Sequence, residues 1–290
     1  MEGFPSLTIE GVTIPRVICG TNALLGWSHV SAGRDAWIRA YYTPERIAEV
    51  WAHCQELGVN AVMGPLFPRL IEALEATERL TGVRPMWVAT TQATQGPRGH
   101  ETEWQAARAA GRREEAARMT RESLADQALE LRDAMASVCL IHGGTMDTWP
   151  EAEGRLPGLD AALTAIRAAG LVPGAMTHDS ARLNLLVEGG YDLPLIGTPV
   201  NRAGWMMSPD RETALAAIAG AGRPILAIKT LACGRLEEGH LAEWLGWAVA
   251  APGVAAIALG VGSAEEAAES IPILRGVYEE RESGALSSPH

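Results

Sequence analysis

Side chains that can exchange protons come directly after short apolar runs of the chain. His142 ends one such run, and Asp147 follows five residues later. His178 comes after a second run. Imidazoles exchange protons near neutral pH, so His142 and His178 form a candidate general acid–base pair. Two histidines and a carboxylate can also hold a divalent metal ion, which makes His142, His178 and Asp147 a candidate metal site.

Lys229 ends a third apolar run and is the only lysine among 24 basic residues. Unlike arginine, a buried lysine can lose its proton and act as a base or as a Schiff-base nucleophile. It can also stay charged and stabilise an anion, or simply pair with a carboxylate. We therefore take Lys229 as a third candidate catalytic residue, either as an electrostatic stabiliser or as an imine-forming amine.

The segments after the first and sixth apolar runs are long and rich in polar and aromatic residues. They supply the candidate substrate-binding residues, which are Asn22, Trp27, His29, Arg34, Asp35, Asn201 and Trp205. Arg34 could hold a carboxylate or phosphate through paired hydrogen bonds. The aromatic rings could stack on a flat ligand, or they could pack the loops against one another.

Eight apolar runs alternate with amphipathic stretches and predict a (β/α)8 barrel, an α/β fold in which strand-end side chains converge. The predicted strands are 16–21, 59–64, 85–91, 137–143, 171–176, 192–198, 224–230 and 254–260. A β-hairpin is expected before them at 7–15. Helix caps are expected at Thr43, Ser208 and Ser263. We expect a single domain over 1–280 and a disordered tail over 281–290.

The alternation of side chains along a strand predicts which of them face the barrel interior. His142 shares its parity with Val138 and Leu140, and His178 shares its parity with Met176. In the seventh run the small Ala227 suits the interior, which would direct Lys229 into the barrel mouth.

Composition restricts the class of protein. The 290 residues are 47% hydrophobic, and the formal net charge of −11 argues against nucleic acid and anionic membranes as partners. No segment has the apolar length of a membrane span, and the chain start lacks the pattern of a signal peptide. The four cysteines are widely spaced and indicate free thiols in the cytoplasm. We expect a small-molecule substrate, and a homo-oligomer is left open.

Three segments resemble the aldo-keto reductase family. VCLIHGG (138–144) resembles its fourth strand, which ends in the active-site histidine. AIKTLACGRL (227–236) resembles its seventh strand and the loop after it, and ALGVGSAEEAAES (258–270) resembles its eighth strand and last helix. The resemblance covers most of the chain and implies a barrel that binds NADP and reduces carbonyl groups.

The chain departs from that family at the residues that carry its chemistry. The resemblance implies a tetrad of Asp, Tyr, Lys and His, but only His142 is present. The second strand reads NAVMGPLFP and the third reads WVATTQ. The family holds the NADP phosphate with basic residues at the start of the last helix, where this chain has Glu265 and Glu266. Carboxylates repel a phosphate, so NAD(P)H is not expected as the cofactor.

A nearer resemblance is to reductase-like barrels that have no established reaction. GWSHVSAGRD (26–35), HGGTMD (142–147) and THDS (177–180) resemble their strand-end segments. We therefore expect an enzyme that acts on a small carbonyl or polyol compound, sugar-like in character, by acid–base or metal-assisted isomerase or lyase chemistry. The alternatives are a nicotinamide-dependent oxidoreductase with a rearranged acid and a binding barrel without catalysis.

Overall fold

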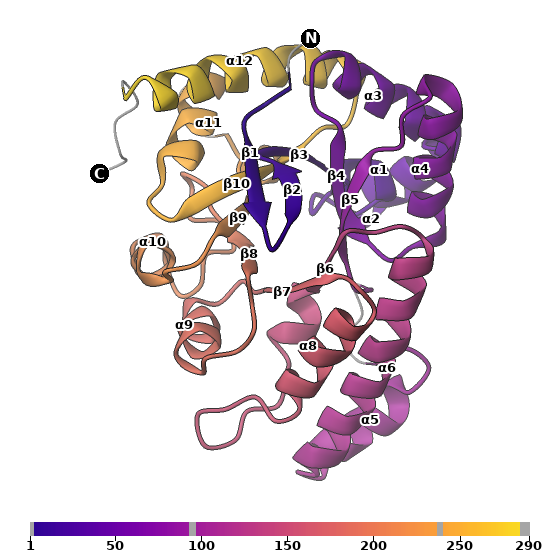
Figure 1. Ribbon diagram of the computed structural model, residues 1–290, viewed down its shortest axis with the longest axis vertical. Coiled ribbons are helices and arrows are strands. Elements are labelled where there is room, and N and C mark those ends of the chain that lie inside the picture. Colours follow the sequence, from indigo (N-terminus) through magenta and orange to yellow (C-terminus); the bar gives the residue numbers. More distant parts are fainter. Residues whose placement is uncertain (1–2, 93–96, 237–239, 285–290) are drawn as a thin grey trace.

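The computed structural model describes residues 3–92, 97–236 and 240–284. Its centre is a closed barrel of parallel strands (Figure 1). The strands are β3 (Val17–Gly20), β4 (Ala61–Pro65), β5 (Met86–Thr90), β6 (Val138–Ile141), β7 (Val172–Met176), β8 (Leu195–Pro199), β9 (Ile225–Ile228) and β10 (Val254–Gly260). Each of these eight strands overlaps one of the predicted apolar runs, and β10 pairs with β3 to close the barrel. The predicted (β/α)8 fold is confirmed.

An antiparallel hairpin precedes the barrel, as predicted. It consists of β1 (Ser6–Ile9) and β2 (Val12–Pro15), joined through Glu10 and Gly11 with positive φ angles of 50° and 84°. Ile9 and Ile14 pack into the apolar interior of the barrel. The hairpin therefore closes the end at which the strands begin, and the opposite end is left for a ligand.

Helices surround the barrel and connect successive strands (Figure 1). They are α1 (Asn22–Leu25), α2 (Ala32–Tyr41), α3 (Pro44–Glu56), α4 (Pro68–Thr81), α5 (Glu101–Ala109), α6 (Arg113–Asp133), α7 (Gly143–Met146), α8 (Leu159–Ala168), α9 (Ser180–Glu188), α10 (Arg211–Gly220), α11 (Leu241–Ala250) and α12 (Ala264–Glu282). Thr43 and Ser263 cap their helices as predicted. The cap of α10 is Asp210 rather than Ser208, because its carboxylate accepts the hydrogen bond from Thr213 N.

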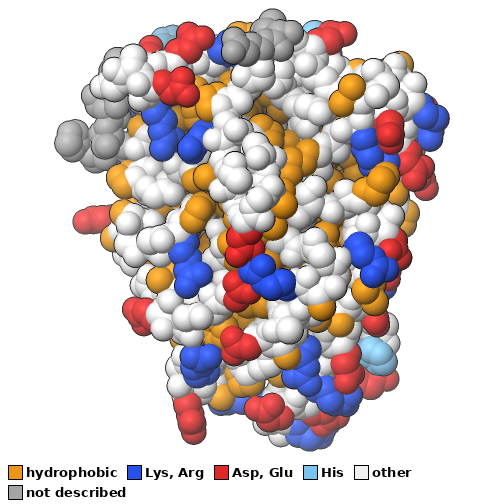
Figure 2. Space-filling model, in the orientation of Figure 1, with side chains coloured by type: hydrophobic (Ala, Val, Ile, Leu, Met, Phe, Trp, Pro, Cys, Tyr) orange, Lys and Arg blue, Asp and Glu red, His pale blue; other side chains and the backbone are white. Residues whose placement is uncertain are grey.

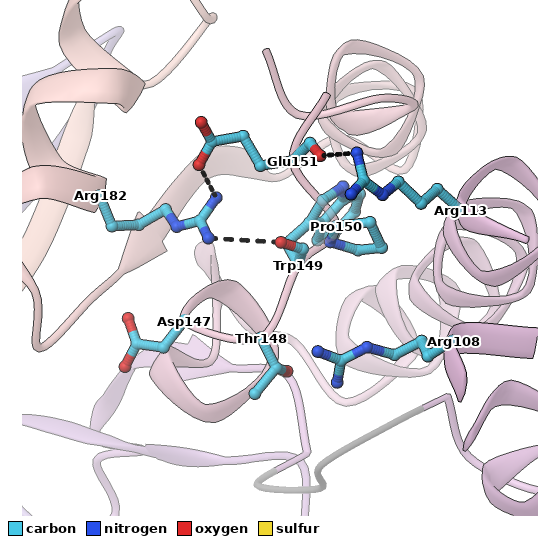
Figure 3. Close-up of a pocket in the computed structure, with 8 residues that line it drawn as sticks. All are labelled: Arg108, Arg113, Asp147, Thr148, Trp149, Pro150, Glu151 and Arg182. Atoms are coloured by element: carbon cyan, nitrogen blue, oxygen red, sulfur yellow. Dashed lines mark hydrogen bonds and ion pairs between the residues drawn. The ribbon is translucent and has the colours of Figure 1, made fainter. Parts of the chain in front are cut away.

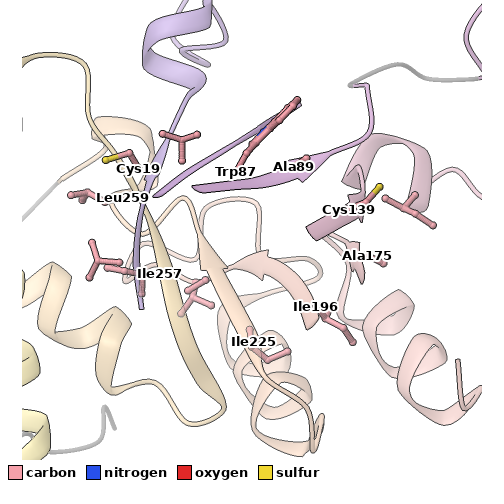
Figure 4. Close-up of a cluster of buried hydrophobic side chains, with 14 of the residues drawn as sticks. Cys19, Trp87, Ala89, Cys139, Ala175, Ile196, Ile225, Ile257 and Leu259 are labelled. Atoms are coloured by element: carbon pink, nitrogen blue, oxygen red, sulfur yellow. The ribbon is translucent and has the colours of Figure 1, made fainter. Parts of the chain in front are cut away.

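Strand residues alternate between two apolar layers. Leu140 and Met176 belong to the interior layer, which agrees with the parity expected for the strands before His142 and His178. In β9 the predicted parity is wrong. Ala227 lies in the layer between sheet and helices, part of which Figure 4 shows, whereas Ile228 faces the interior. Residue size misled the prediction, since bulky side chains fill the barrel centre here.

Two helices, α5 and α6, follow β5 and form a hairpin with a small core of its own. The core contains Trp104, Ala107, Ala116 and Met119, and the Trp104 indole Nε1 donates a hydrogen bond to Thr120 Oγ1 over 3.0 Å. This insertion fixes where the side chains near the α5–α6 turn are placed relative to the barrel.

On the face shown in Figure 2, acidic and basic side chains are interspersed. Among the described residues, no helix combines the length and the apolar character that crossing a membrane requires. The predicted boundary at residue 281 falls inside α12, and residues 285–290 of the predicted tail lie outside the described residues.

Candidate active site

An aspartate–histidine pair joins the segments after β6 and β7. Asp147 Oδ2 accepts a hydrogen bond from the His178 ring at Nδ1 over 2.8 Å, while Thr177 Oγ1 donates to Oδ1 over 2.5 Å. Burial raises the pKa of Asp147, but the hydrogen bonds from His178 and Thr177 outweigh it and lower the pKa. Asp147 is therefore ionised and fixes the His178 proton on Nδ1, which leaves Nε2 free to accept a proton.

Gly143 determines where the His178 ring lies. A Cβ atom at position 143 would come within 2.7 Å of His178 Cε1 and 2.9 Å of Nδ1, closer than real Cβ contacts. The absence of a side chain at Gly143 therefore allows the ring to lie against α7 while it remains bonded to Asp147.

His142 caps α7 and is held in one tautomer. Its Nδ1 accepts a hydrogen bond from Gly144 N over 3.0 Å, and its own backbone N donates to Thr91 Oγ1. Burial lowers the pKa of His142 to about 4, and the electrostatic influence of the neighbouring His178 and Lys229 acts in the same direction. At neutral pH His142 is thus an uncharged ring that carries its proton on Nε2, where it can donate a hydrogen bond to a ligand.

Lys229 lies at the same end of the barrel, where its backbone conformation is no longer that of a strand. Its φ angle of 55° breaks the alternation of β9, and its Nζ lies 3.1 Å from His29 Nε2. Burial lowers the pKa of Lys229. Burial also lowers the pKa of His29 to about 4, with a further contribution from Lys229. The neutral His29 ring can therefore accept a hydrogen bond from the Lys229 ammonium, and Asn22 Nδ2 lies 3.5 Å from the same ring nitrogen.

Trp205 packs beside Lys229 and His29, and the Lys229 Nζ lies 5.6 Å from its ring centroid. Its ring packs edge-on against His29 with centroids 5.3 Å apart, and the Arg235 guanidinium lies 4.2 Å from its ring centroid. The buried Asn201 holds the Trp205 backbone at both ends, by donating to its carbonyl and by accepting from its N–H. The segment after β8 is therefore pinned at Asn201, and its tryptophan forms one wall of the site.

Several predicted site residues lie elsewhere. Arg34 is exposed and lies over the Trp37 ring at 4.5 Å. Asp35 accepts two hydrogen bonds from Ser28, which lower the pKa of its carboxyl group and fix the first loop. Trp27 packs against Phe67. Of the first-loop candidates, the structure brings His29 to Lys229 and Asn22 to His29, and it uses the others to build the loop.

The metal site expected at His142, His178 and Asp147 is not supported. Within the described ranges, no group of three or more His, Cys, Asp or Glu residues could hold a metal ion. Both Asp147 oxygens already accept hydrogen bonds from Thr177 and His178.

Sequence reasoning missed Thr177 and Gly143, and it did not predict the contact that Arg235 makes. Thr177 and Gly143 directly adjoin two predicted histidines, so the THD and HGG triplets contained the signal. Arg235 donates to the His29 carbonyl across 206 positions of the chain, and no local pattern could have indicated that contact.

The fold is similar to that of known proteins, although the sequence is not. No family model matches the chain, and no curated protein matches it by sequence. It is similar in structure to a Pseudomonas aeruginosa protein assigned to the aldo-keto reductases, with a TM-score of 0.61 and 16% identity over 96% of this chain and 97% of that one. A Bombyx mori aldo-keto reductase in complex with NADP gives a TM-score of 0.59 and 12% identity over 96% and 93%. An aldo-keto reductase from Klebsiella pneumoniae in complex with NADPH gives 0.54 and 15% over 100% and 97%.

The chain thus has an aldo-keto-reductase-like barrel. The neighbours are aldo-keto reductases, several with a nicotinamide cofactor bound, and they overturn the expected isomerase or lyase reaction and the expected lack of such a cofactor. Side chains from all eight strand ends reach the same barrel mouth, so a proton donor can come from strands other than the second and third.

Proposed function

We propose that this protein is an oxidoreductase that uses a nicotinamide dinucleotide to interconvert a small carbonyl compound and its alcohol. The observation that carries the proposal is the meeting of Lys229, His142 and the His178–Asp147 pair at the open end of an aldo-keto-reductase-like barrel. These groups offer proton donors of different strength on three different strand ends, in place of the tetrad that the chain lacks.

Lys229 is the proposed proton donor. Burial lowers the pKa of its ammonium, which makes it a stronger acid than a free lysine, and its Nζ stays charged beside the neutral His29 ring. The uncharged His142 donates a hydrogen bond from Nε2 to the carbonyl oxygen and polarises it without adding a charge. His178 Nε2 accepts a hydrogen bond from a neighbouring substrate hydroxyl, with its ring held by Asp147.

The residues at the mouth fit a nicotinamide ring, because His142 and Lys229 present donors that suit carbonyl oxygens such as those of its carboxamide and of a substrate. A bound reduced nicotinamide supplies the hydride for carbonyl reduction. The chain's part is to orient the carbonyl, to provide the proton from Lys229 and to exclude water beneath Trp205.

The start of α12 does not fit a 2′-phosphate. Gly262 N donates to Glu266 Oε2 over 2.7 Å, and Ser263 Oγ accepts from Glu266 N. A carboxylate of the chain therefore occupies the amide that a phosphate would need, and Glu265 lies beside it. Carboxylates at such a position suit the hydroxyls of an unmodified ribose. We therefore propose NAD(H) rather than NADP(H) as the cofactor of this protein.

Binding of the two cofactors tests the proposal directly. Titration of tryptophan fluorescence with NADH and NADPH should give at least about tenfold tighter binding of NADH. A Glu265→Arg variant should narrow that difference, and Glu188→Arg, at the far end of α9, serves as the charge-matched control. If neither cofactor binds the folded protein and no aldehyde is reduced with NADH, the proposed function is refuted.

The remaining features are compatible with an enzyme of the cytoplasm. The four cysteines are free, and three of them are buried in the apolar layer between the strands and the helices. We propose a cytoplasmic, single-domain enzyme that acts on a small molecule.

A further inference from the structure

A pocket on the outer side of Asp147 contains three arginines. It has a volume of about 270 Å³ and lies between the α5–α6 turn, the segment 147–151 and α9 (Figure 3). Its lining comprises Arg108, Arg113, Arg182, Asp147, Thr148, Trp149, Pro150 and Glu151. Because Asp147 contributes to this lining and also bonds to His178, the pocket adjoins the candidate active site.

Arg182 is the best-defined cation of the pocket. Its side chain is only 13% exposed, and its Nη2 donates to the Trp149 carbonyl over 3.3 Å. Its Nη1 is buried and has no hydrogen-bond partner among the described residues, since the Glu151 carboxylate lies 3.9 Å away. A buried guanidinium nitrogen without an acceptor is costly, and a bound anion would satisfy it.

The other two arginines have no carboxylate within 4.0 Å in the described part of the chain. Arg113 donates to the Glu151 carbonyl over 3.1 Å, and Arg108 lies over the Trp104 ring at 4.6 Å. The Asp147 carboxylate is ionised, and its oxygens accept hydrogen bonds from His178 and Thr177. The pocket therefore contains three guanidinium groups and two carboxylates, and of these three arginines only Arg182 has a carboxylate, that of Glu151, within 4.0 Å among the described residues.

We propose that this pocket binds a phosphate or carboxylate group. Planar guanidinium groups pair with such anions through two parallel, charge-assisted hydrogen bonds. A neutral ligand cannot form charge-assisted pairs of this kind. The α9 helix connects the two sites, because His178 lies just before it and Arg182 lies in its first turn. The anion is thus either one end of the carbonyl substrate, in which case the inference rests on the proposed function, or a separate small anion.

Calorimetric titration of the protein alone with inorganic phosphate tests the site without any turnover. Phosphate should bind to the wild type, and Arg182→Gln and Arg108→Gln should each weaken binding at least about tenfold, as loss of a charge-assisted hydrogen bond does. Arg118→Gln is the matched control, because Arg118 lies on α6 outside the pocket and pairs with Glu122. Arg108 is exposed, so its variant keeps the test valid if Arg182→Gln fails to fold.

The source of the anion is distinguished by comparing glyceraldehyde 3-phosphate with glyceraldehyde as substrates in the presence of NADH. A kcat/KM that favours the phosphate ester in the wild type, and loses that preference in Arg182→Gln, supports the substrate as the source. Phosphate binding without such a preference supports a separate anion. Failure of the wild type to bind phosphate, or equal binding by the wild type and both pocket variants, would overturn the inference while leaving the proposed oxidoreductase untouched.

Discussion

Gly143→Ala tests whether the barrel mouth holds His178 rigidly against Asp147. The new Cβ would lie 2.7 Å from His178 Cε1 and 2.9 Å from Nδ1, whereas ordinary contact begins at 3.4 Å. The ring must therefore retreat by about 0.5–0.7 Å. Such a shift can lengthen the 2.8 Å bond to Asp147 beyond hydrogen-bonding distance.

Loss of a hydrogen bond to a charged group costs about 1.5–3 kcal/mol, which corresponds to a reduction of roughly 10- to 150-fold in kcat/KM if His178 acts in the reaction. Overall stability should change less, because alanine favours the helical conformation of α7 by about 0.5–1 kcal/mol over glycine. Initial rates with NADH and a short aldehyde measure the first effect, and thermal unfolding measures the second.

Gly276→Ala is the matched control. Gly276 lies in α12, its added Cβ would meet no atom within 4 Å, and the variant should keep wild-type activity. Proton NMR of histidine-labelled protein adds a readout that does not depend on turnover, since the bonded Nδ1–H of His178 should be protected from exchange. A Gly143→Ala variant with unchanged kcat/KM and an unchanged Nδ1–H signal would refute the idea of a rigidly placed dyad.

Substitutions at three further positions test the other parts of the site. Lys229→Arg and Lys229→Met should both reduce carbonyl turnover by at least about 100-fold, because guanidinium cannot release a proton at neutral pH; substantial activity in the arginine variant alone would show that Lys229 supplies only charge. Burial lowers the pKa of His142 to about 4 in the folded protein from about 6.5 when unfolded, so the unfolded chain binds more protons between these values and stability should fall as pH drops from about 6.5 to about 4. The contribution is at most about 3 kcal/mol, and His142→Asn, which can still cap α7, should flatten this part of the pH profile of urea unfolding. Asn201→Ala should destabilise the protein by about 1–3 kcal/mol and weaken NADH binding by freeing Trp205, whereas unaltered binding and unfolding would show that the segment after β8 is held in another way.

The barrel could be predicted from the sequence because its determinants are local. Each strand is a short apolar run, each following helix has its own periodicity, and caps such as Thr43 act within three residues. Parallel strands joined by helices allow few arrangements, so eight repeats lead to a closed barrel. For the same reason, His142 and His178 could be assigned to one end of the barrel from their positions alone.

The sequence by itself thus determined the fold and the end of the barrel that bears the polar residues. It also distinguished Lys229 as the only lysine of the chain. Only the tertiary structure decided which nitrogen of each histidine is free, because that depends on contacts with Gly144 and with Asp147, 31 residues before His178. It also decided that Lys229 meets His29, 200 residues away, through a positive φ angle that strand parity could not anticipate. The arginine pocket is of the same kind, since α5, α6 and α9 bring together guanidinium groups that have no common pattern in the chain. Local sequence sets local conformation, whereas protonation, pairing and charge balance depend on the neighbours that packing supplies.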